Sequence, residues 1–362
     1  MARRILFLAK RQYMGKDVLA DRYGRLFHLP RELSRHGHTV HCVLSDYRGR
    51  GAIETRDDDG SCAWTSVPLR RPLALYRAMA AGAAWCEVVI GSSDCLQLIL
   101  AHRLARRYGR MLVSDLYDNY ASFGLARLPG MTPAYLAALA DSAVISCVGD
   151  CLAGYVRERV QPRGQVVTVN SVIAPGSFAP RPRDEARAAL GLPPERALIG
   201  ICGGLDRARG IDQLYAAIEV LWQAGVDFDF VIAGRLDPAC PPPRDARVRN
   251  LGNLPFERMN AFYNALDVNV MQYLDNDFGA YCFPQKLHEL IASGAVIAAA
   301  RVGEMAHAFA DTPGLLFEPD DPAAIAATLE RQLTQPVRTT ARPRDWAGEV
   351  ARLAAALETA TG

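Results

Sequence analysis

Two charged residues, three positions apart, lie in the segment 283–294, which reads FPQKLHELIASG. Lys286 and Glu289 share one face of a short helix, because Pro284 is tolerated in a first helical turn and Gly294 suits a C-terminal cap. Apolar runs on both sides, at 268–273 and 295–300, predict strands of a parallel sheet. The helix would then begin at the carboxyl edge of that sheet, where a cation and a carboxylate suit a ligand with phosphate groups and sugar hydroxyls. The alternative is a surface helix with an ordinary ion pair.

A second group of residues suited to chemistry lies at 199–212, where a strand pattern ends in glycines and a helix pattern follows. Gly203 and Gly204 permit a close approach of the backbone to a ligand, and Arg207 and Arg209 add fixed positive charge. A diphosphate is the ligand that these groups would bind best. The segment does not follow the dinucleotide fingerprint G-x-G-x-x-G, which argues against a dehydrogenase. A strand–helix turn with solvated arginines is the alternative.

Short apolar runs alternate with helical patterns along the chain, in two series. Strands of the first series are predicted at 5–9, 39–44, 88–90, 111–114, 143–147 and 166–169, and strands of the second at 198–202, 228–233, 248–251, 268–271, 295–300 and 315–317. Helical patterns lie at 26–36, 96–108, 211–224 and 322–334. This alternation predicts an α/β protein with two Rossmann-like, doubly wound parallel-sheet domains facing a cleft.

A proline-rich stretch around 175–182 separates the two series. We therefore expect an N-terminal domain over 1–175 and a C-terminal domain over 176–342. Residues 343–362 hold an amphipathic helix with Trp346, Val350, Leu353 and Leu357 on one face. We expect this helix to cross back to the N-terminal domain.

The composition is that of a globular enzyme, since half of the 362 residues are hydrophobic and 22% are charged. No apolar stretch is as long as the roughly 20 uncharged residues that a membrane span needs. The apolar run 5–9 continues directly into Lys10 and Arg11, so we expect no signal peptide. The nine cysteines show no C-x-x-C spacing and are expected to be reduced core thiols of a cytoplasmic protein.

The formal net charge of +2 is unevenly distributed, because residues 1–175 carry 23 basic against 15 acidic residues and residues 176–362 carry 18 against 24. An anionic surface or acceptor near the N-terminal half is therefore expected. Arg103, Arg106, Arg107 and Arg110 would cluster on one helix face, which suits peripheral contact with the inner face of a membrane as well as a plain solvated face. Nucleic acid is not expected as a partner, because the basic residues are not interleaved with aromatic ones.

Several motifs follow one another in the C-terminal half: GGLDRARG at 203–210, VIAG at 231–234, LGNLP at 251–255, FYNALDV at 262–268, the segment 283–294, and LFEPDDP at 316–322. Their order closely resembles the C-terminal lobe of the GT-B glycosyltransferases, specifically the large retaining family four. In the N-terminal half, LSRHGHTV at 33–40 and VNSV at 169–172 resemble that family's first helix and its inter-lobe linker. The resemblance covers most of the chain and is strongest over 199–322.

The resemblance implies roles for charged residues of the C-terminal half. Arg209 takes the place of the family's phosphate-binding lysine, whereas Gly204 replaces its phosphate-binding arginine, for which Arg207 would compensate. Glu289 matches the second glutamate of the family's E-x7-E pair and would hold the ribose hydroxyls of the nucleotide. Tyr281 stands where the first glutamate belongs, so the chain would represent a Pro-x-Lys-Leu-x-Glu variant.

Two residues of the N-terminal half also acquire roles from the resemblance. Gly15, in the loop after the first strand, would let the backbone approach the donor phosphate or the acceptor, although the family's usual glycine pair is absent. Asp118 follows the strand at 111–114 and would lie close to the transferred sugar. The acidic runs 57–60 and 275–277 are expected to be turns, although 275–277 imitates a metal-binding D-x-D. The histidines show no metal-ligand spacing, and we expect no metal and no cofactor.

The resemblance as a whole implies a retaining, metal-independent transfer of a sugar from a nucleoside-diphosphate donor, with UDP or GDP favoured. The acceptor would be a hydroxyl of a glycan, a glycolipid or another lipid-linked precursor of a cell-envelope polysaccharide. Asp118, Arg209 and Lys286 would be catalytic. The residues that would bind the nucleotide sugar are Gly15, Gly203, Gly204, Arg207, Arg209, Lys286 and Glu289. A sugar-nucleotide epimerase of the same two-lobe fold and a non-catalytic nucleotide-sugar-binding protein are the alternatives.

Overall fold

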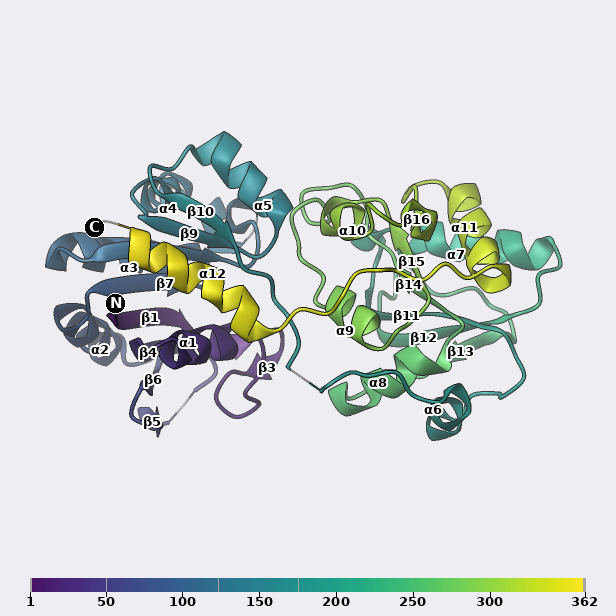
Figure 1. The fold of residues 1–362 in the computed structure, drawn as a ribbon, viewed down its shortest axis with the longest axis horizontal. Helices are drawn as coiled ribbons and strands as arrows, with labels where there is room; N and C mark the ends of the chain where they lie inside the picture. The colour runs from purple at the N-terminus through teal and green to yellow at the C-terminus, as the bar shows by residue number, and fades with distance from the viewer. Residues whose placement is uncertain (1, 50, 123, 175, 361–362) are drawn as a thin grey trace. The chain divides into compact units, whose positions relative to one another are not determined.

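The chain forms two compact units (Figure 1), and the computed structural model describes residues 2–49, 51–122, 124–174 and 176–360. Unit 1 comprises Met1–Val172, Tyr281–Phe283 and Arg344–Gly362. Unit 2 comprises Ile173–Ala280 and Pro284–Pro343. Each unit has its own parallel sheet with helices packed against it.

Unit 1 is built on an eight-stranded sheet with the order β10-β9-β8-β7-β1-β4-β6-β5. Its strands are β1 (Arg4–Lys10), β4 (Thr39–Asp46), β5 (Glu54–Asp58), β6 (Cys62–Pro68), β7 (Val88–Ser92), β8 (Met111–Leu116), β9 (Val144–Cys147) and β10 (Gln165–Thr168). Every neighbouring pair is parallel except β5 with β6. A separate hairpin of β2 (Gln12–Tyr13) and β3 (Lys16–Asp17) follows β1.

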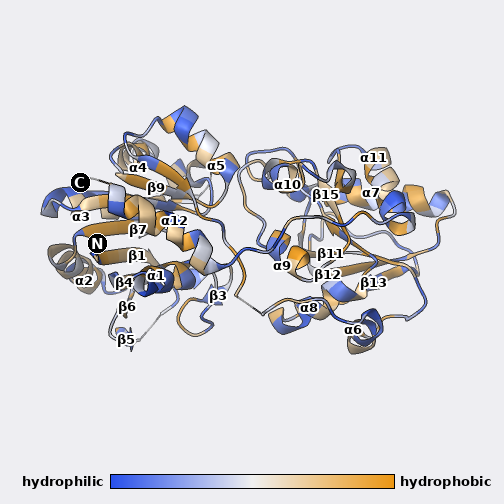
Figure 2. Ribbon diagram, viewed as in Figure 1, coloured by the Kyte–Doolittle hydropathy of each residue, from blue (hydrophilic) through white to orange (hydrophobic). Residues whose placement is uncertain are grey.

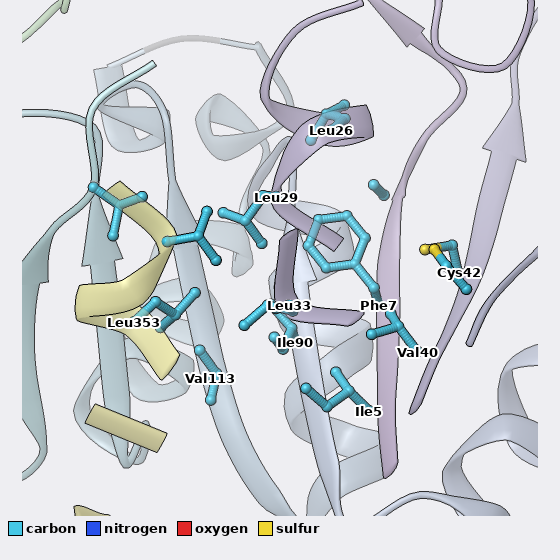
Figure 3. Packing of buried hydrophobic residues seen from close by; sticks show 14 of the residues in the cluster. Ile5, Phe7, Leu26, Leu29, Leu33, Val40, Cys42, Ile90, Val113 and Leu353 are labelled. Atoms are coloured by element: carbon cyan, nitrogen blue, oxygen red, sulfur yellow. The ribbon is translucent and has the colours of Figure 1, made fainter. Parts of the chain in front are cut away.

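Alternate residues of β1 face two different layers of helices. Ile5 and Phe7 pack in one cluster with α1 (Arg25–Arg35) and α12 (Trp346–Thr359), and Figure 3 shows Leu353 of α12 in this cluster. Leu6 and Leu8 belong to a second cluster with α2 (Pro72–Trp85) and α3 (Cys95–Tyr108). A third cluster joins α3 to α4 (Met131–Ala140) and α5 (Asp150–Tyr155). The strand is therefore buried on both sides, which is why it is a continuous apolar run.

Unit 2 contains a six-stranded parallel sheet with the order β13-β12-β11-β14-β15-β16. Its strands are β11 (Leu198–Leu205), β12 (Asp229–Leu236), β13 (Val248–Asn250), β14 (Val268–Met271), β15 (Ile297–Ala300) and β16 (Leu316–Phe317). The helices are α6 (Arg183–Leu190), α7 (Ile211–Gln223), α8 (Phe256–Ala265), α9 (Lys286–Ala292), α10 (Gly303–Ala308) and α11 (Pro322–Thr334). The strand order reverses at β11, whose neighbours are β12 and β14. In open α/β sheets ligands bind outside the carboxyl ends of the strands at such a reversal.

The prediction of two Rossmann-like parallel-sheet domains is confirmed. The prediction of a turn over 57–60 is wrong for Asp57 and Asp58, which end the antiparallel edge strand β5. This strand is acidic because it is an edge strand whose carboxylates find local partners. Asp58 pairs with Arg56 at 2.8 Å and with Arg31 at 3.0 Å, and the indole N–H of Trp64 donates to it at 3.1 Å.

Hydropathy follows the architecture, and Figure 2 shows the central strands β1 and β7 as hydrophobic while the helices carry mixed colours. No disulfide joins the nine cysteines, which all lie in the described ranges, and all but Cys151 are buried. None of the helices in the described ranges combines the length and apolarity that crossing a membrane would require.

Candidate functional site

The carboxyl end of β11 carries two glycines that lie against cationic side chains. Gly203 has a φ of +115°, and a Cβ atom there would come within 2.5 Å of Lys286 Nζ. A Cβ atom at Gly204 would lie 2.9 Å from a terminal guanidinium nitrogen of Arg209. Any side chain at position 203 would therefore displace the lysine. The structure brings Gly203, Gly204, Arg209 and Lys286 together at the strand where the sheet order reverses.

Lys286 is the first residue of α9 and reaches back to β11, where its ammonium group donates a hydrogen bond to the carbonyl oxygen of Cys202. Burial by itself would lower the pKa of Lys286. The electrostatic influence of Cys202, Tyr273 and Glu289 outweighs burial, so the pKa is raised. Lys286 is therefore a cation at neutral pH, and its bond to Cys202 uses one of its three N–H donors.

The turn after β11 holds its two arginines in different ways. Asp206 caps the turn by accepting a bond from the backbone N–H of Arg209, and its carboxylate also pairs with the Arg209 guanidinium. That guanidinium lies 4.9 Å from the centroid of the Phe278 ring. The Arg207 side chain is 69% exposed, and its Nε lies 3.6 Å from a carboxylate oxygen of Asp212. Arg209 is thus fixed in place, whereas Arg207 extends into solvent.

The acidic run 275–277 forms a turn that builds one wall of the site. Asn276 Oδ1 accepts bonds from the backbone N–H groups of Phe278 at 3.1 Å and Gly279 at 2.9 Å. Its Nδ2 donates to the carbonyl oxygen of Ala208 at 3.0 Å, which ties this turn to the one after β11. Phe278 gives no signal in the sequence, because its contact with Arg209 joins distant segments. Over the described residues, no group of three or more histidine, cysteine or acidic side chains could hold a metal ion.

Glu289 lies further along α9 and is only 6% exposed. Its Oε2 accepts a 2.5 Å hydrogen bond from the hydroxyl of Tyr263 in α8, a partner that sequence reasoning missed. Burial raises the pKa of Glu289, and the Tyr263 bond and the Lys286 charge offset this only in part. Its Oε1 accepts no hydrogen bond from any residue that the structure describes. Lys286 and Glu289 thus take separate partners and are not an ordinary surface ion pair.

Asp118 lies in unit 1, just beyond the carboxyl end of β8. Its Oδ1 accepts a 2.8 Å bond from the backbone N–H of Asn119. Burial raises the pKa of the Asp118 carboxyl to about 6, and the Asn119 bond lowers it less. Next to it, the ring of Tyr117 lies edge-on to those of Tyr13 and Tyr120, at 5.0 and 5.4 Å. A carboxyl group with such a pKa can donate as well as accept hydrogen bonds near pH 6.

Replacing Asp118 by asparagine is expected to stabilise the protein at pH 8 but not at pH 4. The pKa of Asp118 is raised on folding, so the difference in pKa between the folded and unfolded states stabilises the folded protein at low pH. This stabilisation is fully present below the unfolded pKa of about 3.9. That contribution is lost as the pH rises through the folded value of about 6. Allowing for its partial exposure, we expect the variant's Tm to exceed the wild-type Tm by roughly 2–4 °C at pH 8. Thermal unfolding at both pH values checks this, and an equal Tm difference at pH 4 and pH 8 would contradict it.

Gly15 lies at the tip of the hairpin formed by β2 and β3, where Met14 and Gly15 have φ values of 50° and 82°. A two-residue turn of this kind requires the left-handed region at both positions. Gly15 is exposed, and no atom lies within 4 Å of a Cβ built there. The turn itself accounts for the glycine.

Tyr281, which stands at the place of the family's first glutamate, packs within unit 1. Its ring centroid lies 4.9 Å from that of Tyr155, and Tyr281 and Phe283 both border the cluster of α3, α4 and α5. The position therefore has an aromatic packing contact where the family has a carboxylate.

A hollow of about 670 Å³ lies at the opposite, amino edge of the unit 1 sheet. Its walls include Arg106, Arg163 and His102, whose Nε2 lies 2.8 Å from a carboxylate oxygen of Asp141. Asp118 follows the carboxyl end of β8, so this hollow is not part of the candidate site.

Residues 196–335, which include all the cationic residues around β11, match the sequence family described as Glycosyl transferases group 1. The match covers less than half of the chain. The fold comparison extends over both units. Sucrose-phosphate synthase from Thermosynechococcus elongatus has a TM-score of 0.71 at 17% identity, with 99% of this chain and 94% of that chain covered. HepE from Anabaena, solved in complex with UDP, has a TM-score of 0.66 at 13% identity, with 97% and 94% covered. The chain therefore has the GT-B fold.

Curated relatives come from bacteria. D-inositol 3-phosphate glycosyltransferase 1 from Catenulispora acidiphila is 28% identical over 276 residues, which are 66% of this chain and 64% of that protein. The 2-deoxystreptamine glucosyltransferase of Streptomyces kanamyceticus is 28% identical over 177 residues, 46% of this chain and 44% of that protein. The chain thus matches less than two thirds of the length of either relative.

Proposed function

We propose that this protein is a retaining, metal-independent glycosyltransferase that moves a sugar from a nucleoside-diphosphate sugar to an acceptor hydroxyl. The observation that carries the proposal is the cationic cluster at β11. Lys286 and Arg209 lie against two glycines, and buried Glu289 follows Lys286 on the same short helix. The two cations suit the phosphates of a nucleoside diphosphate, and the glycines let these phosphates approach the backbone. The nearby carboxylate suits the hydroxyls of the ribose.

Departure of the nucleoside diphosphate builds negative charge on the phosphate oxygens. Arg209 and Lys286 would stabilise this charge without reorganisation, because their side chains are already held in place. Asp206 and Phe278 hold the Arg209 guanidinium, and the Cys202 carbonyl holds the Lys286 ammonium group. The backbone N–H groups at the start of α7 would add to the positive potential. Charge stabilisation by side chains and backbone is the basis for proposing a reaction without a metal.

Glu289 would bind the ribose of the donor. Tyr263 holds its Oε2, and Oε1 is left to accept a bond from a ribose hydroxyl. Asp118 in unit 1 would contact the transferred sugar, and the acceptor hydroxyl would attack on the face that the leaving group vacates, with the departing phosphate as base. Gly15, on its exposed hairpin, would serve the donor phosphate or the acceptor.

We favour UDP or GDP as the donor nucleotide. HepE has been solved with UDP and with UDP-glucose, and starch synthase IV from Arabidopsis thaliana with ADP, which supports a nucleoside diphosphate as the ligand class. The acceptor in this proposal is a glycan or a lipid-linked precursor of the cell envelope, and the reaction takes place in the cytoplasm.

Peripheral contact of unit 1 with a membrane is part of the proposal for a lipid-linked acceptor. Of the four clustered arginines on and just after α3, Arg103, Arg106 and Arg107 are exposed. Arg110 instead donates to the carbonyl oxygens of Ala83 and Ala84 at the end of α2, at 3.0 and 2.9 Å. The surface left to meet anionic lipid is therefore smaller than the sequence pattern indicates.

A thermal-shift panel with UDP, GDP, ADP, CMP and NAD tests the donor site. We expect one nucleoside diphosphate at 100 times its Kd to add about 2.7 kcal/mol of stability, a Tm shift of several degrees. Glu289→Ala should abolish most of this shift, because the ribose then loses its acceptor. Glu289→Gln is the matched control, since it keeps the size and one acceptor oxygen. Stabilisation by NAD and by no nucleoside diphosphate would overturn the proposal.

A non-catalytic nucleotide-sugar-binding protein is the second candidate, because Gly204 and Tyr281 replace two charged residues of the family's site. Incubation with the stabilising nucleotide sugar in the absence of an acceptor separates the classes. A transferase releases the nucleoside diphosphate slowly by hydrolysis, an epimerase changes the sugar and keeps it bound to the nucleotide, and a binding protein leaves the donor intact.

A further inference from the structure

Arg235 lies beside Gly204, the position at which the phosphate-binding arginine is missing. β11 and β12 are parallel neighbours, and their register sets Gly203 opposite Gly234 and Gly204 opposite Arg235. Neighbouring strands lie about 4.8 Å apart, a separation that an arginine side chain easily spans. A guanidinium from β12 can therefore reach the neighbourhood of Gly204, where the Arg209 guanidinium also lies.

A pair of facing glycines fixes this register. Gly203 and Gly234 have φ values of +115° and +125°, and a Cβ atom at Gly234 would come within 2.1 Å of the Gly203 carbonyl oxygen. The Gly234 N–H donates in turn to the carbonyl oxygen of Gly252 at 2.8 Å. The strands can approach in this way only where position 234 carries no side chain. The backbone of Arg235 is consequently held next to Gly204.

No residue in the described ranges compensates the charge of Arg235. Its side chain is exposed and makes no hydrogen bond or ion pair with a residue inside the described ranges. One carboxylate follows the end of β11 and another follows the end of β12. Asp206 pairs with Arg209, and Asp237 accepts the backbone N–H of Ala239 at 2.9 Å. An exposed, uncompensated guanidinium at the carboxyl edge of β12 is available to an anionic ligand.

We infer that Arg235 binds the diphosphate of the donor and supplies the charge that Gly204 lacks, an inference that rests on the proposed function. Arg207, the other arginine near this position, already has Asp212 as its neighbour and lies on the turn beyond β11. Arg235 is in register with Gly204 and pairs with no acidic residue in the part of the chain that the structure describes. The guanidinium fork suits two phosphate oxygens at once, as the missing arginine would have done.

Titration calorimetry with UDP or GDP, whichever stabilises the wild type, and with the matching nucleoside tests the inference. We expect Arg235→Gln to weaken the diphosphate about tenfold to a hundredfold, the range for one charge-assisted contact. Binding of the nucleoside should stay within about twofold, because it carries no phosphate. Arg244→Gln is the matched control, since Arg244 is also exposed and the charge change is the same.

The outcomes distinguish a failure of the proposed function from a failure of the inference about Arg235. If the wild type binds neither diphosphate, the proposed function fails and the inference fails with it. If the wild type binds but Arg235→Gln loses no more than Arg244→Gln, the proposed function stands and the inference is overturned. Equal losses for diphosphate and nucleoside also overturn it, because Arg235 would then contact the nucleoside.

A second test places an arginine on β11, at position 204, in a variant that lacks the Arg235 charge on β12. Gly204 does not have a left-handed φ, and a Cβ there would meet only the flexible ends of Arg209 and Asp206, so the backbone accepts a side chain. We expect the double variant Gly204→Arg with Arg235→Gln to bind the diphosphate more tightly than Arg235→Gln alone. At least half of the loss in log Kd should be recovered. No recovery by a correctly folded double variant, with an unliganded Tm equal to that of Arg235→Gln, would count against a shared role.

Discussion

Replacing Asp115 by alanine is expected to destabilise unit 1 by about 3–5 kcal/mol, the range for a buried charge that loses its partner. Asp115 and Arg25 are both fully buried, and their charged groups are 2.6 Å apart. The carboxylate also accepts bonds from the hydroxyl of Ser92 at 2.6 Å and from that of Ser146. One side chain of β8 thereby joins α1, β7 and β9. Without it, the Arg25 guanidinium stays buried without a counter-charge.

Urea unfolding of the wild type and Asp115→Ala measures this loss. The control is the double variant Arg25→Met with Asp115→Leu, which removes both charges and should recover most of the stability, because a hydrophobic pair of similar volume can replace a buried ion pair. A loss below about 1 kcal/mol in the single variant would mean that the pair behaves like an exposed one.

Replacing Lys286 by methionine is expected to lower the rate of donor breakdown about 10²–10³-fold, as removal of one preorganised donor at a developing charge typically does. The loss should appear mainly in kcat, because the charge on the leaving phosphate grows in the transition state. Release of nucleoside diphosphate from the donor without acceptor provides the measurement. Since Lys286 lowers the pKa of Glu289, this pKa should be higher in the variant, so nucleotide binding should begin to weaken at a higher pH than in the wild type as the pH falls.

Gly203→Ala is the companion to this variant. It leaves the lysine in the chain, but its methyl group would occupy the place of Lys286 Nζ, and its φ of +115° is strained for alanine. We expect a comparable loss of rate. A folded Lys286→Met protein with a rate within threefold of the wild type would exclude Lys286 from the chemistry.

Much of the architecture could be predicted because parallel strands covered on both faces are continuous apolar runs. The candidate site could be proposed from sequence because its parts are local. Gly203, Gly204 and Arg209 fall in one strand–turn–helix segment, and Lys286 and Glu289 fall in another. The two segments follow neighbouring strands, β11 and β14, so parallel topology alone places them at one edge.

Long-range contacts could not be predicted from the sequence. Phe278, Tyr263 and Arg235 reach the site through packing and strand register, and no local pattern distinguishes them from ordinary surface or core residues. Asp115 was hidden within an apolar run, and its partner Arg25 lies 90 positions away in the sequence. The β5 strand was missed because edge strands tolerate the charged residues that usually indicate a turn.

The position of α12 has a consequence for the order in which the protein can assemble during synthesis. Val350, Leu353 and Leu357 complete a core whose other members, such as Ile5 and Val113, are translated first. At about 5–20 residues per second, the whole of unit 2 emerges from the ribosome while that core waits for its last helix. Unit 2 can therefore fold before the unit that precedes it in the chain is finished. Until then, the nascent N-terminal sheet keeps exposed the apolar surface that α12 later covers.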